Sequence, residues 1–357
     1  MTAIFDQPIT EPSAWTAADL EGDRHWEITL ASEEVADLLA ANARVKAADL
    51  PLTGIGAGNF PLPRCQATVD RIREELRDGR GFALLYGFPI EGQDRADIER
   101  MDWGFCAHLG TGLTQNGDGT LIHYVTEGRL RPNQGTRGVG NPGTVPLHVD
   151  LADVVSLLCL RQPKDSPQSR IASSTTVHNL IHERASHLLP RLYDGFAWDR
   201  QNEHDSQEAP TTGYRVPVFS ARNGVVSCRY NRNWMMKAAQ RDGGDFSPEE
   251  AALLDLFDEL AAECMFEFPF NPGDIQFANN YTVLHGRAPH APATSEEKTR
   301  LLMRIWTNID DFRPYADEAI IRNGIIRHGR LGWTAEQLAV GLECKRHPRR
   351  QSDGAPA

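Results

Sequence analysis

The chain has 357 residues, and its 49 acidic against 37 basic side chains give a formal net charge of -12 at pH 7. This balance argues against a nucleic-acid-binding surface, which needs a basic stripe to meet the phosphates. No apolar run approaches the roughly 18 residues of a membrane span, and no secretory leader is recognisable. The six cysteines form no C-x-x-C pair, so we expect reduced thiols and a cytoplasmic location.

The first predicted element is a helix over residues 67–78. Val69, Ile72 and Leu76 recur at helical spacing there, and the pattern stops at Gly79. Elsewhere, 30 glycines and 22 prolines punctuate short apolar runs, which favours many strands over a helical bundle. We therefore predict a mainly β fold of the jelly-roll type, a double-stranded β-helix with flanking helices.

Residues 110–146 are rich in Gly, Asn, Gln and Thr and have little apolar periodicity. A long segment of this kind inside a compact domain is usually functional or disordered. We interpret it as a loop that covers the substrate, with Gln115 and Asn116 as candidate substrate contacts. An ordinary mobile loop without a ligand is the alternative.

A candidate metal-binding pair follows that loop. The sequence PLHVD, residues 146–150, leads into an apolar run over 151–160 that predicts a buried strand. Residues i and i+2 of a strand face the same side, so His148 and Asp150 can bind one ion. About 1 or 2 such triplets arise by chance in this composition. His25-Trp26-Glu27 is another, and we assign it no role.

Further elements are predicted between residues 201 and 268. The polar, turn-rich residues 201–213 are a second candidate cover for the site. Ser247, Pro248 and Glu250 form the start of a capped helix, which should run to about Glu263 and precede a strand over 265–268. The helices are expected to pack against the core, and we assign them no chemistry.

The last predicted strands carry a histidine and two arginines. A turn at 271–274 precedes a strand over 275–278, and His285 follows a further apolar stretch. In a strand over 299–308, Arg300, Arg304 and Trp306 lie on one face. Arginines in an otherwise apolar strand normally need an anionic partner, although both could simply solvate a surface.

Two imidazoles and one carboxylate are the set that binds Fe(II) on one face, leaving positions open for a co-substrate and oxygen. His148, Asp150 and His285 supply this set. Arg300 could then bind a carboxylate of the co-substrate through two parallel hydrogen bonds. The residues therefore indicate an iron-dependent enzyme.

In this order and spacing, His148-x-Asp150, the Leu-His-Gly-Arg run around His285 and Arg300-x-x-x-Arg304 resemble the TauD/TfdA family of Fe(II)/2-oxoglutarate dioxygenases. This family is related to clavaminate synthase and gamma-butyrobetaine hydroxylase. The resemblance covers residues 81–308, and the run GRGFALLYGFPI is similar to the first strand of the family. It implies that His148, Asp150 and His285 hold iron, that Arg300 binds the distal carboxylate of 2-oxoglutarate, and that a hydroxyl group such as Ser169 assists.

The same resemblance implies Fe(II), 2-oxoglutarate and molecular oxygen as cofactors, and a small polar metabolite of a biosynthetic pathway as the substrate. Arg304 would contact an anionic substrate or stiffen the site, and Trp306 would pack beside it. Asp150 favours hydroxylation over halogenation, because related halogenases lack that carboxylate. Desaturation, epoxidation and cyclisation stay open. The family also implies a homo-oligomer.

Two other classes of protein compete with this interpretation. One is a jelly roll with a purely structural metal or a sensing role, and the other is a zinc-dependent hydrolase. A structural metal site has no need of Arg300, and the H-E-x-x-H helix that would favour a hydrolase is absent from the sequence. We expect a single domain over residues 1–344, and the basic segment 345–357 to be a flexible tail.

Overall fold

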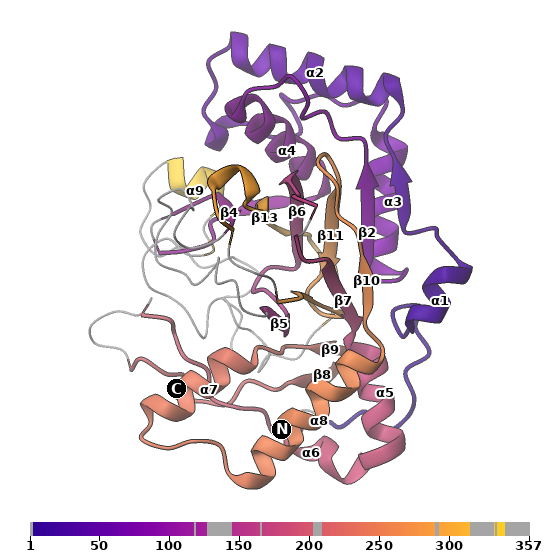
Figure 1. The fold of residues 1–357 in the computed structure, drawn as a ribbon, viewed down its shortest axis with the longest axis vertical. Coiled ribbons are helices and arrows are strands. Elements are labelled where there is room, and N and C mark those ends of the chain that lie inside the picture. Colours follow the sequence, from indigo (N-terminus) through magenta and orange to yellow (C-terminus); the bar gives the residue numbers. More distant parts are fainter. Residues whose placement is uncertain are drawn as a thin grey trace.

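Two β-sheets form the centre of the molecule (Figure 1). The computed structural model describes residues 3–117, 119–126, 145–164, 166–202, 209–289, 293–314, 332 and 334–339. Every pairing in these two sheets is antiparallel except that of β1 with β2. None of the described helices is both long and apolar enough to cross a bilayer.

The larger sheet has seven strands, with β4 pairing to β13 beside the main order. In spatial order its members are β1 (Glu27–Thr29), β2 (Phe82–Tyr86), β11 (Ile275–Asn279), β6 (Val154–Arg161), β13 (Leu301–Asn308) and β3 (Thr111–Leu113), with β4 (Ile122–Val125) at the side. The smaller sheet contains β10 (Phe266–Phe268), β7 (Ser169–Ser173), β12 (Val283–Arg287) and β5 (Val145–His148). A separate hairpin joins β8 (Phe219–Arg222) to β9 (Val225–Cys228).

Helices gather at the two ends of the sheets. Figure 1 shows α2 and α4 above the larger sheet, α3 along its side and α5 to α8 below the smaller sheet. Their bounds are α1 (Ala17–Gly22), α2 (Ser32–Ala47), α3 (Gln66–Arg77), α4 (Arg95–Leu109), α5 (Ser174–Ala185), α6 (Leu189–Asp194), α7 (Arg232–Arg241), α8 (Pro248–Glu263) and α9 (Ala335–Ala339). Short 3-10 turns occur at Leu52–Gly54, Ser186–Leu188 and Glu296–Lys298.

The larger sheet is buried on both faces, and each face belongs to its own apolar core. Along β13, Leu302 and Trp306 pack into the core shared with the smaller sheet, whereas Met303 and Ile305 pack into the core under α2, α3 and α4. Strand residues alternate between faces, so one strand serves both cores. The inner face of β13 also carries Arg304, which therefore lies between the sheets.

Several predicted elements are confirmed. The helix expected over 67–78 is α3, and the helix expected from Pro248 to Glu263 is α8, with Ser247 and Glu250 forming its capping box. The strands expected over 275–278 and 299–308 are β11 and β13. The jelly-roll prediction is also confirmed, because short antiparallel strands form the core and helices flank it.

Two local predictions are wrong. Residues 110–146 include β3 and β4, two short strands that pair with β13. The strand expected over 151–160 begins only at Val154. Asp153 explains the delay, because its carboxylate accepts hydrogen bonds from the Tyr281 hydroxyl (2.8 Å) and the Ile309 amide (3.0 Å). Residues 127–144 and the predicted tail over 345–357 lie outside the described part of the chain.

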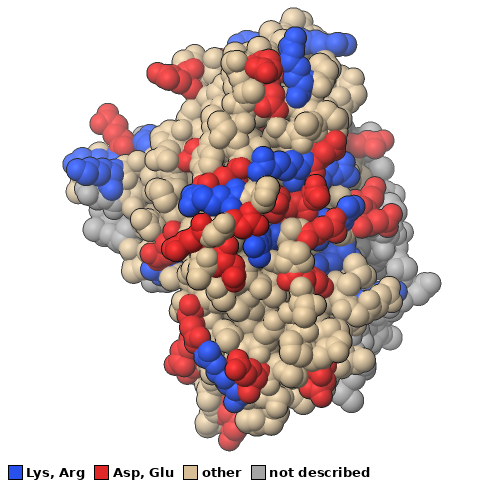
Figure 2. All heavy atoms as spheres, turned by 90° about the vertical axis from the view of Figure 1, so that its right-hand side faces the viewer, with Lys and Arg blue, Asp and Glu red and all other residues tan. Residues whose placement is uncertain are grey.

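On the face shown in Figure 2, acidic and basic side chains lie side by side in a band across the middle of the molecule. Large areas above and below this band carry uncharged residues. Interleaved charges of both signs cancel over short distances in salt solution. This face therefore presents no extended field of a single sign.

A buried carboxylate lies in the core beneath the helices. Asp102 of α4 is fully buried, and its Oδ1 accepts only a weak hydrogen bond from Cys106 Sγ at 3.8 Å. Its Oδ2 has no hydrogen-bond partner among the described residues. Burial raises the pKa of Asp102 to about 8, because the charged form loses its hydration. The side chain is therefore largely protonated at neutral pH.

This proton makes stability depend on pH. The unfolded chain releases it near pH 4, and the folded protein only near pH 8. The free energy of unfolding should therefore fall as pH rises through this window. Asp102→Asn should gain stability relative to wild type between pH 5 and pH 8, measured as the difference in Tm. The surface variant Asp245→Asn is the control. A difference for Asp102→Asn that is the same at both pH values would contradict the assignment.

Candidate active site

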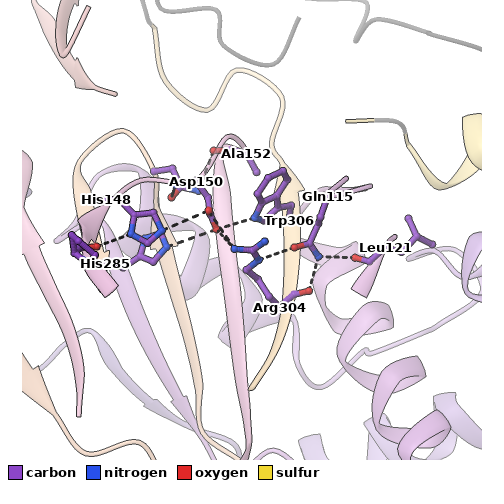
Figure 3. Close-up of polar contacts among 10 residues, drawn as sticks. Gln115, Leu121, His148, Asp150, Ala152, His285, Arg304 and Trp306 are labelled. Atoms are coloured by element: carbon purple, nitrogen blue, oxygen red, sulfur yellow. Dashed lines mark hydrogen bonds and ion pairs between the residues drawn. The ribbon is translucent and has the colours of Figure 1, made fainter. Parts of the chain in front are cut away.

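Two neighbouring strands of the smaller sheet bring two histidines together. His148 is the last residue of β5, and His285 lies at the centre of β12. The two residues are direct partners in the strand register, and their ring centroids are 4.6 Å apart. Figure 3 shows both rings side by side, with Asp150 next to them. Residues 137 positions apart in the sequence thus share one site.

A glycine allows this close approach. A Cβ at Gly286 would lie 2.7 Å from the Val145 carbonyl oxygen, which is closer than real Cβ contacts. The register between β12 and β5 also shifts at this point. Any other residue at position 286 would therefore push β5 away from β12 and separate the two imidazoles.

Asp150 lies in the loop after β5 and not in the strand, so the prediction that it shares a strand face with His148 is wrong. Asn280 holds this loop: its Oδ1 accepts the Asp150 amide (2.9 Å), and its Nδ2 donates to the Ala152 carbonyl (3.1 Å). The turn nevertheless directs the carboxylate to the histidines. Asp150 Oδ1 is 4.0 Å from His148 Nε2, and Oδ2 is 3.7 Å from His285 Nε2.

Two donors from β13 hold the Asp150 carboxylate from its other side (Figure 3). Trp306 Nε1 donates to Oδ2 at 2.9 Å, and Arg304 Nη1 lies 3.1 Å from the same oxygen. Burial opposes ionisation, but the Arg304 guanidinium, the two imidazoles and the Trp306 N–H hold the pKa of Asp150 well below its usual range. The carboxylate is therefore ionised at physiological pH.

Arg304 is fixed in turn by Gln115, which sequence analysis named as a candidate substrate contact. Arg304 Nε donates to Gln115 Oε1 at 2.7 Å. Gln115 Nε2 donates to the Arg304 carbonyl (2.6 Å) and to the Leu121 carbonyl (2.9 Å). Gln115 is therefore a support for the guanidinium and not a wall of the cavity.

His285 is in the form that binds a metal. Burial, followed by the neighbouring His148, lowers the pKa of His285 to about 3, so its ring is neutral. His148 Nδ1 lies 2.8 Å from the Pro146 carbonyl, which directs the lone pair of Nε2 toward Asp150 when Nδ1 carries the proton. Donor atoms of all three residues lie within 4.8 Å of one another.

These positions fit a transition-metal ion. Two atoms that each bind an ion at about 2.1 Å lie at most about 4.2 Å apart. Both distances from Asp150 to the histidines meet this limit. Two imidazoles and one carboxylate are also the donor set that suits Fe(II) with open positions. The residues present therefore fit a bound iron.

A second polar group lies at the start of β13. Arg300 Nη2 donates to Ser169 Oγ (2.7 Å), and its Nε donates to Gln162 Oε1 (2.8 Å). Arg300 is only 7% exposed, and no carboxylate of the described residues forms an ion pair with it. Burial, followed by a charge effect of Arg287, lowers its pKa to about 10, so the guanidinium remains charged at neutral pH. A buried cation with only neutral partners is suited to bind an anion.

A cavity of about 220 Å³ opens beside the metal-binding residues. His148, Asp150, Arg304 and Trp306 lie along its inner part. The remaining lining comes from the loop after β5, from residues 198–201 and from the start of α7: Val149, Leu151, Trp198, Gln201, Asn231, Asn233, Trp234, Met236 and Lys237.

Trp306 lines this cavity, but Asn116 does not. The Asn116 side chain closes a turn, because it donates to Thr120 Oγ1 (2.9 Å) and accepts from the Thr120 amide (3.0 Å). No pattern in the sequence pointed to Gln162, Asn280 or Lys237. Asn280 and Gln162 have roles that depend on contacts between distant segments, so no local pattern marks them. For Lys237, the one local signal in the sequence is its place on a helix of mixed polarity, and this does not mark a residue of the site.

Gly286→Ala should weaken metal binding at least about tenfold, because the added methyl group forces β5 from β12. Such overpacking typically costs about 1 to 3 kcal/mol. Anaerobic titration with Fe(II), followed by tryptophan fluorescence, measures the affinity. Gly56→Ala is the matched control, since a Cβ there meets no atom within 4 Å. Equal affinities in the two variants would show that strand separation does not limit the site.

Trp306→Phe should lower metal affinity about 10- to 100-fold, the usual effect of losing a hydrogen bond to a ligand. Phenylalanine keeps most of the buried ring but lacks the donor to Asp150. Trp26→Phe is the control, since its indole N–H donates to the Asp23 carbonyl, remote from these ligands. If both variants bound Fe(II) as wild type does, the indole would have no part in holding the carboxylate.

The family model described as taurine catabolism dioxygenase TauD, TfdA family matches residues 48–306. FR-33289 synthase from Streptomyces rubellomurinus is 30% identical over 322 residues, covering 88% of this chain and 94% of that relative. A taurine hydroxylase-like protein from Stachybotrys chartarum is 23% identical, covering 85% of this chain and 80% of its own length.

Solved structures share the fold. An asparagine oxygenase in complex with Fe(II), (2S,3S)-3-hydroxyasparagine and succinate has a TM-score of 0.62 at 16% identity, covering 79% of this chain and 93% of that chain. The non-heme iron oxygenase OrfP, in complex with Fe and alpha-ketoglutaric acid, has a TM-score of 0.59 at 19% identity, with coverages of 80% and 94%. The match of the family model over most of the chain decides the family. The chain belongs to the TauD/TfdA family and is an Fe(II)/2-oxoglutarate-dependent dioxygenase, an oxidoreductase that uses Fe(II), 2-oxoglutarate and molecular oxygen.

Proposed function

We propose that His148, Asp150 and His285 hold the iron and that the enzyme hydroxylates a small polar metabolite. The observation that carries the assignment is the convergence of these three donors, with their atoms within 4.8 Å, beside a cavity. The neutral His285 ring and the ionised Asp150 carboxylate are already in their metal-binding protonation states. When bound, iron and 2-oxoglutarate together activate oxygen for insertion into a C–H bond.

Arg300 and Ser169 are proposed to bind the distal carboxylate of 2-oxoglutarate. Ser169 of β7 is two residues from Ile171, which is the register partner of His285. Two strand residues span about 7 Å, close to the length of a five-carbon dicarboxylate. Ser169 and Ile171 lie on the same face, so the anion site and the metal ligands face the same space. A guanidinium with neutral partners supports this role.

For Arg304 we propose a positioning role in place of contact with an anionic substrate. Its guanidinium is engaged by Asp150 and Gln115, and it lies 5.1 Å from the Trp306 ring centroid. Arg304 Nη1 lies 3.4 Å from Oδ1 and 3.1 Å from Oδ2 of Asp150, so it holds the carboxylate with Oδ1 toward His148 and Oδ2 toward His285. Asp150 itself supports hydroxylation over halogenation, because it takes the position that a halide would need.

The size and lining of the cavity support a small substrate. A volume of about 220 Å³ is below the roughly 300 to 1,000 Å³ of typical drug-sized sites. Two solved relatives were crystallised with amino-acid ligands, 3-hydroxyasparagine and L-Arg. Trp198, Trp234 and Trp306 contribute aromatic surface to the lining of the cavity. Cytoplasmic location, homo-oligomerisation and the choice between hydroxylation and related oxidations stay predictions.

Arg300→Gln should raise the Kd for 2-oxoglutarate about 10- to 100-fold, because a charged hydrogen-bond donor contributes about 1.5 to 3 kcal/mol. Ser169→Ala should have a smaller effect, about fivefold. The measurement is anaerobic addition of Fe(II) and then 2-oxoglutarate, following the visible charge-transfer absorption of the chelate. The affinity for Fe(II) alone should not change.

Arg184→Gln is the matched control, since this guanidinium pairs with Glu263 on an exposed surface. His148→Ala should abolish the absorption altogether. Wild-type protein that binds Fe(II) but develops no absorption with 2-oxoglutarate would overturn the proposed cofactor site. An unchanged Kd in Arg300→Gln would move the distal carboxylate elsewhere.

A further inference from the structure

The outer wall of the cavity carries a cation that the proposed chemistry does not use. Lys237 of α7 lines the same cavity as His148 and Asp150 but comes from a different part of the chain. Among the lining residues, the acidic side chain is Asp150, and its charge is met by Arg304. Within the described part of the chain, no carboxylate pairs with Lys237. Among the described residues, none therefore neutralises the positive charge of Lys237 at this end of the cavity.

A hydrogen-bonded relay orients this ammonium group. Lys237 Nζ donates to Gln201 Oε1 at 3.0 Å. The amide of Gln201 cannot reverse easily, because its Nε2 donates to Asp199 Oδ1 at 2.7 Å. Asp199 is fully buried and is also ion-paired with Arg241. One donor of Lys237 is thus engaged, and the ammonium group has two further N–H donors.

The wall that carries Lys237 is tied to the metal-binding loop. The Val149 amide, between His148 and Asp150, donates to the Tyr230 carbonyl at 2.9 Å. Asn231 follows at once and caps α7, its side chain accepting from the Trp234 amide. This backbone bond fixes where α7 begins relative to the metal ligands. The backbone of Lys237 therefore has a set position relative to the metal ligands, and its side chain is exposed to solvent at the edge of the cavity.

We propose that Lys237 selects substrates with an anionic group, such as a carboxylate, sulfonate or phosphonate, at the end remote from the oxidised carbon. The inference rests on the proposed function, because it takes the cavity beside the iron ligands as the substrate site. Trp198 and Trp234 line the same cavity, so we expect part of such a substrate to be apolar or of mixed polarity. Arg304, engaged by Asp150, does not fill this role. Lys237 is a specificity-determining residue and takes no part in holding the metal.

The test uses matched pairs of small molecules that share a carbon skeleton and differ only in an anionic group or its neutral amide. N-acetyl amino acids with their amides, and alkyl sulfonates with their sulfonamides, are suitable. Succinate release above the substrate-free rate identifies the accepted members. We expect the anionic members to be accepted. Lys237→Gln should raise their KM about tenfold with kcat nearly unchanged, and Lys237→Arg should restore most of the affinity.

Arg44→Gln, an exposed cation on α2 at the far end of the molecule, is the matched control and should leave KM unchanged. Equal acceptance of anionic and neutral members, or an unchanged KM in Lys237→Gln, would overturn the role of Lys237. These outcomes differ from those expected if the proposed function itself is wrong. If it is wrong, wild-type protein would also lack the charge-transfer absorption and the substrate-free turnover of 2-oxoglutarate.

Discussion

Keeping a carboxylate ionised between two sheets costs free energy, and the groups around Asp150 offset that cost. An isolated buried charge would neutralise by taking up a proton. Here the Arg304 guanidinium and the Trp306 N–H stabilise the charge, and two imidazoles lie beside it. The same two donors determine where the carboxylate points. The groups that stabilise the charge of Asp150 therefore also position it as a metal ligand.

The double-sided burial of the larger sheet gives this arrangement its rigidity. Strand β13 is clamped between β6 and the edge strands β3 and β4, with a separate apolar core on each face. Its inner face can therefore present Arg304 and Trp306 with little freedom of movement. Sites built on strands whose neighbours are fully packed keep their geometry better than sites built on loops. The loop that carries Asp150 gains its order from Asn280 and β13.

The sequence was informative where local patterns carry the structure. Alternation along 299–308 predicted which residues of β13 face inward, and the capping box predicted the start of α8. Motif spacing predicted that His148, Asp150 and His285 would meet. It could not predict that Asp150 leaves the strand, because Asn280 and Asp153 act across the fold. The supporting role of Gln115 likewise depends on a partner 189 residues away.

The remaining limits of the sequence have similar causes. The edge strands β3 and β4 have only three and four residues, too few for an alternating pattern to stand out within a glycine-rich segment. Lys237 lines the cavity only because α7 folds against it, which the sequence does not show. The single-domain boundary at residue 344 stays a prediction, since most residues after 314 lie outside the described part of the chain.

The hydrogen bond between the Val149 amide and the Tyr230 carbonyl has a consequence for protein engineering. It joins the loop of iron ligands to the start of α7 through main-chain atoms alone, so exchanging side chains on the helix leaves the joint intact. New substrate preferences could then be introduced by recoding Asn233, Met236 and Lys237 as a set. The oxidation chemistry and the selection of its target are in this sense separately adjustable parts of one scaffold.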